Sequence, residues 1–180
     1  IQAALDGCAA GDIIELTDGT FLGDGNRDLD FGGKALTLHS QSGDAELCVI
    51  DCQGSAADPH RGFDFHSGEG AESIVHGITI IHGYAAGASP DGDGGGVRCR
   101  DGSSPRLRYC VVTECTAEGM GGGVSGENGS GPILECCRLV LNLILVRLLG
   151  IEGLAWATVI SIHLHLALSL LFLKRYRLGL

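Results

Sequence analysis

Proline and aromatic residues are scarce in this chain of 180 residues, which has 4 Pro and only 5% Phe, Trp and Tyr. Glycine is abundant, at 30 residues, but it follows no Gly-X-Y period, which excludes a collagen-like triple helix. Hydrophobic residues make up 44% of the chain, which is too many for an intrinsically disordered protein. CxxC pairs are absent although the chain has 8 Cys, so the cysteine spacing matches no familiar zinc site.

Basic residues are scarce in the first part of the chain. Residues 1–137 carry 7 Lys and Arg against 21 Asp and Glu, a formal net charge of −14, and hold all 8 Cys. Residues 138–180 carry 5 Lys and Arg and a single acid, Glu152, a net charge of +4. The acidic part lacks the cationic surface that nucleic acids require, so we expect no nucleic-acid partner. The change in composition predicts two domains, 1–137 and 138–180.

A 27-residue offset relates two segments of the first domain. The residues that match across it are Gly94–Val97 with Gly121–Val124, Pro105 with Pro132, Leu107 with Leu134, and Cys110 with Cys137. Short alternating apolar runs bounded by Gly, Asp, Asn or Ser predict short strands and turns. One such unit cannot bury its inner face alone, whereas units stacked about 4.8 Å apart can, as in a solenoid. We predict a mainly β fold, a right-handed parallel β-helix with glycine triplets at its tightest corners.

A looser copy of the unit precedes these two. The matching residues are Val75, Ile78 and Ile80 with Leu107, Cys110 and Val112. Because the apolar residues in each copy do not alternate strictly, we predict a bend between two short strands.

The first residues of the chain predict a small helix. The apolar residues Ile1, Ala4, Leu5 and Cys8 have the spacing of one helix face, and Gly11 is the expected helix end. A stacked solenoid has an open end whose unpaired backbone groups promote aggregation. We therefore expect this N-terminal helix to lie across that end as a cap.

The segments 1–6, 11–14 and 18–21 resemble the opening of pectin-lyase-like right-handed parallel β-helix proteins. The Gly-Gly-Gly-Val and Ser-Ser-Pro…Cys repeats are similar to those of secreted bacterial β-helix repeat proteins. The resemblance implies an extracytoplasmic or cell-envelope location for residues 1–137, with a polysaccharide or another envelope surface component as the partner. The chain begins at Ile1 without a methionine or a signal-peptide pattern, as expected of a fragment or a processed product.

Five polar residues around the predicted strand 63–65 are candidate ligand-binding residues. They are His60, Arg61, Asp64, His66 and Glu69. Asp64 alternates with Phe63 and Phe65, so its side chain is expected to point outward. Outward polar residues on one face would form a glycan-binding strip, and ordinary exposed strand residues are the alternative.

The family resemblance also implies an enzymatic alternative, because the family's members include polysaccharide lyases and hydrolases. A lyase of this fold holds Ca²⁺ with carboxylates and uses an Arg or Lys base. Asp91 and Asp93 are the candidate Ca²⁺ ligands, with a solvated turn as the alternative. Since no motif pairs a base with a metal site, we predict no catalytic residues and no required cofactor, and we favour a non-catalytic binding module.

The cysteines are expected to be structural. Cys110 and Cys137 have equivalent repeat positions, so they should stack as small buried apolar side chains. Disulfide bonds are the alternative for an extracytoplasmic protein, and a zinc site is the least favoured interpretation of the cysteines.

The composition of the second domain predicts a hydrophobic helical hairpin. Residues 154–173 carry no formal charge over 20 positions, and a basic cluster follows, which predicts a membrane-spanning helix with a cytoplasmic C-terminal end. Residues 141–145 and 149–161 resemble the late helices of a polysaccharide flippase of the multidrug/oligosaccharidyl-lipid/polysaccharide export superfamily. This resemblance leaves a further alternative, a remnant or fusion of such a flippase, although two helices cannot form a transport path.

Overall fold

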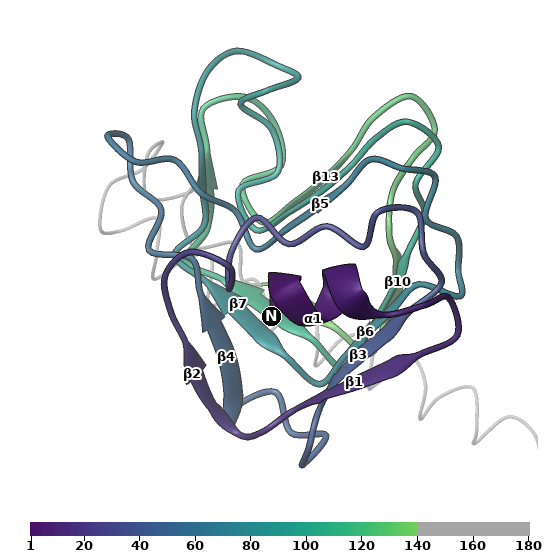
Figure 1. Cartoon of the computed structure of the whole chain (residues 1–180). Coiled ribbons are helices and arrows are strands. Elements are labelled where there is room, and N and C mark those ends of the chain that lie inside the picture. The colour runs from purple at the N-terminus through teal and green to yellow at the C-terminus, as the bar shows by residue number, and fades with distance from the viewer. Residues whose placement is uncertain (140–180) are drawn as a thin grey trace, which may run out of the picture. The chain divides into compact units, whose positions relative to one another are not determined.

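The computed structural model describes residues 1–139, which form one short helix and fifteen strands (Figure 1). The compact unit that contains them runs from Ile1 to Val140, close to the predicted boundary after residue 137. Within the described residues, no helix has the length and apolar character needed to cross a membrane. The predicted span 154–173 and most of the predicted helical segment 138–180 lie outside the described residues.

The strands stack in parallel sheets that follow successive coils of the chain. The first sheet contains, in order, β1 (Ile13–Leu16), β3 (Thr37–Ser40), β6 (Ile74–His76), β10 (Arg106–Arg108) and β14 (Ile133–Glu135). The second contains β2 (Gly19–Phe21), β4 (Cys48–Asp51), β7 (Thr79–Ile81), β11 (Val111–Thr113) and β15 (Arg138–Leu139). The third contains β5 (Phe63–Phe65), β9 (Val97–Cys99) and β13 (Val124–Gly126), and a short fourth pairs β8 (Tyr84–Ala85) with β12 (Thr116–Ala117). The result is a parallel β-solenoid of about four turns.

The strand register confirms the repeat and its looser copy. The pairs in register are Leu107 with Leu134, Val97 with Val124, Val75 with Leu107, and Ile80 with Val112. The predicted bend lies between the first and second sheets, where Tyr109 and Cys110 connect β10 to β11. Tyr109 has a φ of +51°, which turns the chain sharply at this corner.

The interior of the solenoid is apolar because alternate residues of each strand point inward. The inward column of the first sheet consists of Ile14, Leu38, Val75, Leu107 and Leu134. On the third sheet, the rings of Phe63 and Phe65 are stacked with their centroids 5.6 Å apart. Leu134 belongs to the last described coil and is 41% exposed, whereas Leu107 is fully buried beneath it.

Helix α1 (Gln2–Gly7) lies across the N-terminal end of the solenoid, as predicted for a cap (Figure 1). Its Leu5 side chain is fully buried in the core. Lys34 Nζ donates hydrogen bonds to the carbonyl oxygens of Leu5 at 2.6 Å and Cys8 at 3.1 Å, which satisfies backbone acceptors at the helix end. The helix ends at Gly7, earlier than the predicted end at Gly11.

Arg138 and Leu139 correct the predicted start of the hydrophobic helical segment. They form β15, in which Arg138 pairs with Val111 and Leu139 with Val112. The alternation of the solenoid continues past Cys137 because Leu139 takes the inward position that Val112 has in the coil before.

Candidate functional site

The outer face of the third sheet carries part of the predicted ligand cluster. Asp64, Arg98 and Ser125 lie in register on this face, one from each strand. Arg98 donates two hydrogen bonds to Asp64, from Nε to Oδ1 at 3.0 Å and from Nη2 to Oδ2 at 2.6 Å. The Arg98 side chain is only 6% exposed and that of Asp64 16%, so the pair is largely shielded from solvent.

The loop between β8 and β9 covers this ion pair. Arg98 Nη1 donates to the carbonyl oxygen of Pro90 at 3.2 Å, and Arg61 Nη2 donates to that of Asp91 at 2.8 Å. Arg61 Nε also donates to the carbonyl oxygen of Gly94 at 3.2 Å. Arg61 therefore holds the loop through several hydrogen bonds, whereas Arg98 gives the loop one hydrogen bond and Asp64 two.

The two histidines of the predicted cluster have carboxylate neighbours. His60 is hydrogen-bonded through Nδ1 to Oδ2 of Asp28, and its Nε2 lies 3.2 Å from Oδ1 of Asp58. His66 Nε2 lies 3.7 Å from Oδ2 of Asp30. The structure therefore places these histidines at the two ends of β5, each beside acidic side chains.

Glu69 lies in the interior, apart from the rest of the predicted cluster. Its side chain is fully buried and accepts hydrogen bonds from Gly33 N at 2.9 Å, Ser67 N at 3.0 Å and Ser103 Oγ at 2.8 Å. Burial acts to raise the pKa of Glu69, but these hydrogen bonds outweigh it, so the pKa lies below its usual value. Glu69 therefore fastens three chain segments together, a structural role.

The two candidate Ca²⁺ ligands have different surroundings. The Asp91 side chain is 89% exposed and lies 3.7 Å from Nη1 of Arg98. Asp93 is fully buried, and its carboxylate accepts hydrogen bonds from Met120 N at 2.6 Å and Ser89 Oγ at 2.7 Å. Among residues 1–139, no three His, Cys, Asp or Glu side chains are grouped closely enough to hold a metal ion.

The charges around Asp64 decide its protonation state. Burial acts to raise the pKa of this carboxyl, but the hydrogen bonds from Arg98 and the charges of Arg98, Arg61 and Arg100 outweigh it. The pKa of Asp64 therefore lies below its usual value, and the side chain is an ion at neutral pH.

Replacing Arg98 by alanine is expected to lower the free energy of unfolding by about 3 kcal/mol, because it leaves the shielded Asp64 charge without its main partner. Arg100→Ala is the matched control, since the Arg100 side chain is 35% exposed and lies 3.9 Å from Asp64. We expect this control to cost less than about 1 kcal/mol. Urea unfolding followed by circular dichroism measures both, and equally small losses would contradict the assigned role of the pair.

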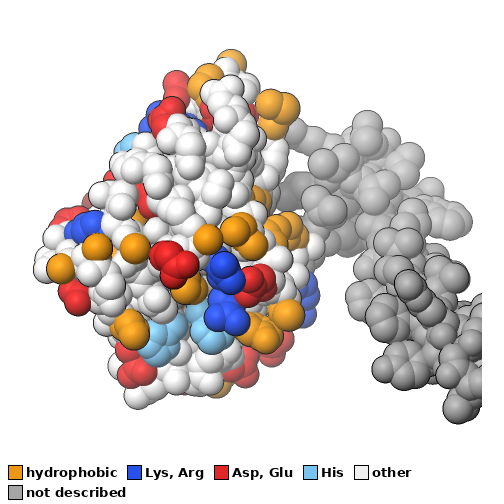
Figure 2. Space-filling view, turned by 90° about the vertical axis from the view of Figure 1, so that its right-hand side faces the viewer, with side chains coloured by type: hydrophobic (Ala, Val, Ile, Leu, Met, Phe, Trp, Pro, Cys, Tyr) orange, Lys and Arg blue, Asp and Glu red, His pale blue; other side chains and the backbone are white. Residues whose placement is uncertain are grey.

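The outer face of the first sheet forms a second polar surface, which sequence reasoning missed. One column in register contains Glu15, His39, His76, Arg108 and Glu135. The column beside it contains Ile13, Thr37, Ile74, Arg106 and Ile133. Figure 2 looks onto this side of the molecule, where histidine, basic and acidic side chains gather beside hydrophobic ones. We call these two columns the first-sheet face.

A carboxylate joins the two arginines of the first-sheet face. Arg106 Nη1 lies 2.8 Å from Oε1 of Glu135, and Arg108 Nε lies 2.9 Å from Oε2. The His76 ring packs against the ring of Tyr109, with centroids 5.5 Å apart. Burial, followed by the charges of Arg108 and His39, lowers the pKa of His76. The face therefore presents two arginines, the carboxylates of Glu15 and Glu135 and the neutral imidazole of His76, and the exposed ring of Tyr109 lies beside it.

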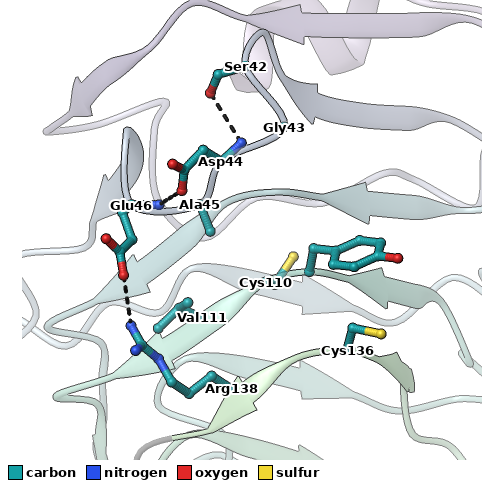
Figure 3. Close-up of a pocket in the computed structure, with 10 residues that line it drawn as sticks. Ser42, Gly43, Asp44, Ala45, Glu46, Cys110, Val111, Cys136 and Arg138 are labelled. Atoms are coloured by element: carbon teal, nitrogen blue, oxygen red, sulfur yellow. Dashed lines mark hydrogen bonds and ion pairs between the residues drawn. The ribbon is translucent and has the colours of Figure 1, made fainter.

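A hollow of about 470 Å³ lies at the corner between the first and second sheets (Figure 3). Its lining includes Glu46 from the loop after β3, Tyr109, Cys110, Cys136 and Arg138. Arg138 Nη2 lies 3.6 Å from Oε1 of Glu46 across this hollow. The hollow borders the first-sheet face through Tyr109.

Comparison with protein-family models, with curated proteins and with solved structures gives no match, so it supports neither the pectin-lyase-like nor the flippase resemblance. The structure itself defines the class of the described part, a short parallel β-solenoid with polar outer faces.

Proposed function

We propose that residues 1–139 form a non-catalytic extracytoplasmic module, a short right-handed parallel β-helix that binds an acidic glycan on the first-sheet face. The observation that carries this proposal is the pair of columns in register, one mainly polar and one mainly apolar, on a single parallel sheet.

The two columns match the surface chemistry of a sugar chain. A pyranose ring has apolar faces and a polar edge, so it can contact both columns at once. Ile13 is 68% exposed, Ile133 41% and Tyr109 51%, which gives the face an accessible apolar surface. Polar side chains repeat about every 4.8 Å along the solenoid axis, so a polymer lying along that axis meets several of them.

The two arginines of the first-sheet face favour an acidic glycan, while Glu15 and Glu135 on the same face balance their formal charge. Arg106 and Arg108 are partly exposed, and each keeps N–H groups beyond those that meet Glu135. Arginine pairs with carboxylates through directed, charge-assisted hydrogen bonds, and Glu135 shows that a carboxylate fits between these two side chains. The net charge of −10 opposes a polyanion elsewhere on the surface, so binding should be confined to this face and weakened by salt.

The arrangement at the third sheet favours binding over catalysis. A lyase or hydrolase needs an acid and a base that reach one substrate position. Arg98 is engaged by Asp64, and Arg61 by backbone carbonyl oxygens of the loop before β9. The alternative function is a polysaccharide lyase or hydrolase, with Ca²⁺ at Asp91 and Asp93 as its cofactor.

The extracytoplasmic location is part of this proposal, and so is attachment to a membrane through residues 154–173. The alternative of a flippase remnant or fusion also rests on residues 141–161. These segments lie outside the described residues.

Removing both arginines of the first-sheet face is expected to weaken binding to polygalacturonate roughly tenfold or more, because each supplies charge-assisted hydrogen bonds to carboxylates. The measurement is affinity electrophoresis of the full chain in gels that contain polygalacturonate, with neutral dextran as the control polymer. Arg100→Ala removes a positive charge directly after β9, away from the first-sheet face, and should leave the mobility shift unchanged. Equal losses in Arg100→Ala and in the Arg106→Ala/Arg108→Ala variant would refute the choice of face.

A further inference from the structure

Cys110 and Cys137 occupy equivalent corners in consecutive coils. Arg108 is in register with Glu135, and Val111 with Arg138. Between these pairs, Tyr109 N donates to Glu135 O and Arg138 N donates to Cys110 O, both at 2.9 Å. The segments Tyr109–Cys110 and Cys136–Cys137 therefore stack directly on one another.

The stacked corners bring two thiols together inside the solenoid. Equivalent residues on neighbouring parallel strands lie about 4.8 Å apart, within the range of about 4.4–6.8 Å between Cα atoms that a disulfide requires. Cys110 is 1% exposed, and its thiol donates to the carbonyl oxygen of Arg108 at 3.3 Å. Cys137 is half-buried, and its thiol donates to the carbonyl oxygen of Leu107 at 3.2 Å. Cys136, which has a φ of +54°, is exposed instead.

We propose that Cys110 and Cys137 are a redox-active pair that forms a disulfide between the last two described coils by exchange with a small-molecule disulfide. Both thiols are free in this structure. This inference is independent of the proposed glycan binding, because neither sulfur belongs to the first-sheet face.

The exchange proceeds in two balanced steps. The Cys137 thiolate attacks the small disulfide, RSSR, forms a mixed disulfide and releases one thiolate. Cys110 then loses its proton, and its thiolate attacks Cys137 Sγ, which releases the second thiolate. The two protein thiols are oxidised, and RSSR is reduced to two molecules of RSH.

The surroundings suit Cys137 to the first step. The interaction between the two thiols lowers the pKa of Cys137 and raises the pKa of Cys110, which burial raises further. A thiolate is the attacking form, and Cys137 is half-buried, so a small reagent can reach it more readily than Cys110. The hollow in Figure 3 lies at the same corner and is lined by Cys110 and Cys136.

The bond would strengthen the least covered part of the described solenoid. Leu134 and Leu139 are inward-facing residues of the last described coil, yet they are 41% and 40% exposed. A disulfide from this coil to the buried Cys110 closes a loop whose ends lie 27 positions apart, which disfavours the unfolded chain.

The test oxidises the native full chain with glutathione disulfide, blocks the remaining thiols, and digests it with trypsin and a Glu-specific protease. This digestion separates Tyr109–Glu114, Cys115–Glu118 and Cys136–Arg138. We expect mass spectrometry to find the first peptide linked to the third, with the link lost in Cys137→Ala and retained in Cys136→Ala. Oxidation should also raise the melting temperature by roughly 5–10 °C in the unaltered chain but not in Cys137→Ala.

Four results would overturn the proposal, and the first three concern Cys136, Cys137 and the overall oxidation state. They are a bond between Cys136 and Cys137, a link that survives Cys137→Ala, and a chain in which all eight thiols stay reduced after glutathione disulfide treatment. A link from Tyr109–Glu114 to Cys115–Glu118 would likewise contradict the stacked geometry.

Discussion

Replacing Gly96 by alanine is expected to lower the free energy of unfolding by about 3 kcal/mol, because the added methyl group has no space. Gly96 ends the glycine triplet before β9, where its N–H donates to the carbonyl oxygen of Gly123 in the next coil at 3.0 Å. A Cβ there would lie 2.6 Å from the carbonyl oxygen of Gly123 and 2.6 Å from Cγ1 of Val112. That oxygen is held by a 2.9 Å hydrogen bond from Val97 N, so it cannot move aside without a further loss.

Gly123 is the matched control, since it has the same position one coil later. A Cβ there would lie 3.6 Å from its nearest neighbour, Cγ1 of Val112, which is ordinary contact. We expect Gly123→Ala to change the free energy of unfolding by less than about 1 kcal/mol. Denaturant unfolding of both variants, followed by far-UV circular dichroism, gives the comparison. Similar effects at the two positions would mean that the coils do not stack as described.

Replacing Glu69 by alanine is expected to cost about 4 kcal/mol, because three hydrogen-bond donors would lose their acceptor in the interior. Two of them are the backbone N–H groups of Gly33 and Ser67, and the third is the Ser103 hydroxyl. Glu72→Ala removes an exposed carboxylate from the same turn and should be nearly silent. Thermal unfolding of the two variants measures the difference, and a small effect of Glu69→Ala would show that water replaces the carboxylate.

The effect of Glu69→Ala should depend on pH in a defined direction. The pKa of Glu69 is lower in the folded chain than in the unfolded chain, where it is about 4.3. Its stabilising contribution is therefore complete above the unfolded pKa and is lost as the pH falls through the folded pKa. We expect the stability difference from the unaltered chain to be constant above about pH 5 and to shrink below about pH 4.

The solenoid could be predicted because its later coils repeat at one offset. Leu107 and Leu134 align by counting along the sequence, and they are in register in the structure. The first-sheet face could not be found in this way, because the earlier coils differ in length. His39 and His76 are neighbours across the sheet although 37 positions separate them, and Glu15 is 24 positions before His39.

The sequence predicted which way the Asp64 side chain points, but it did not predict which residues surround the third-sheet cluster. Alternation correctly predicts that Asp64 points outward from β5. It does not show that the loop before β9 folds back over Arg98, because that contact depends on where a non-repetitive segment packs. The prediction that Glu69 belongs to an exposed ligand-binding cluster failed for a similar reason. A carboxylate within a glycine-rich turn usually faces water, whereas Glu69 accepts hydrogen bonds from three separate segments.

The central claim is that the described solenoid binds an acidic glycan and leaves it chemically unchanged. Calorimetric titration of the full chain with an oligogalacturonate of defined length, followed by mass spectrometry of the recovered sugar, tests both parts at once. We predict saturable binding that weakens in the Arg106→Ala/Arg108→Ala variant, together with recovery of the oligosaccharide at its original mass. Absence of binding, or recovery of shorter sugars carrying an unsaturated uronic acid or an added water, would contradict the account.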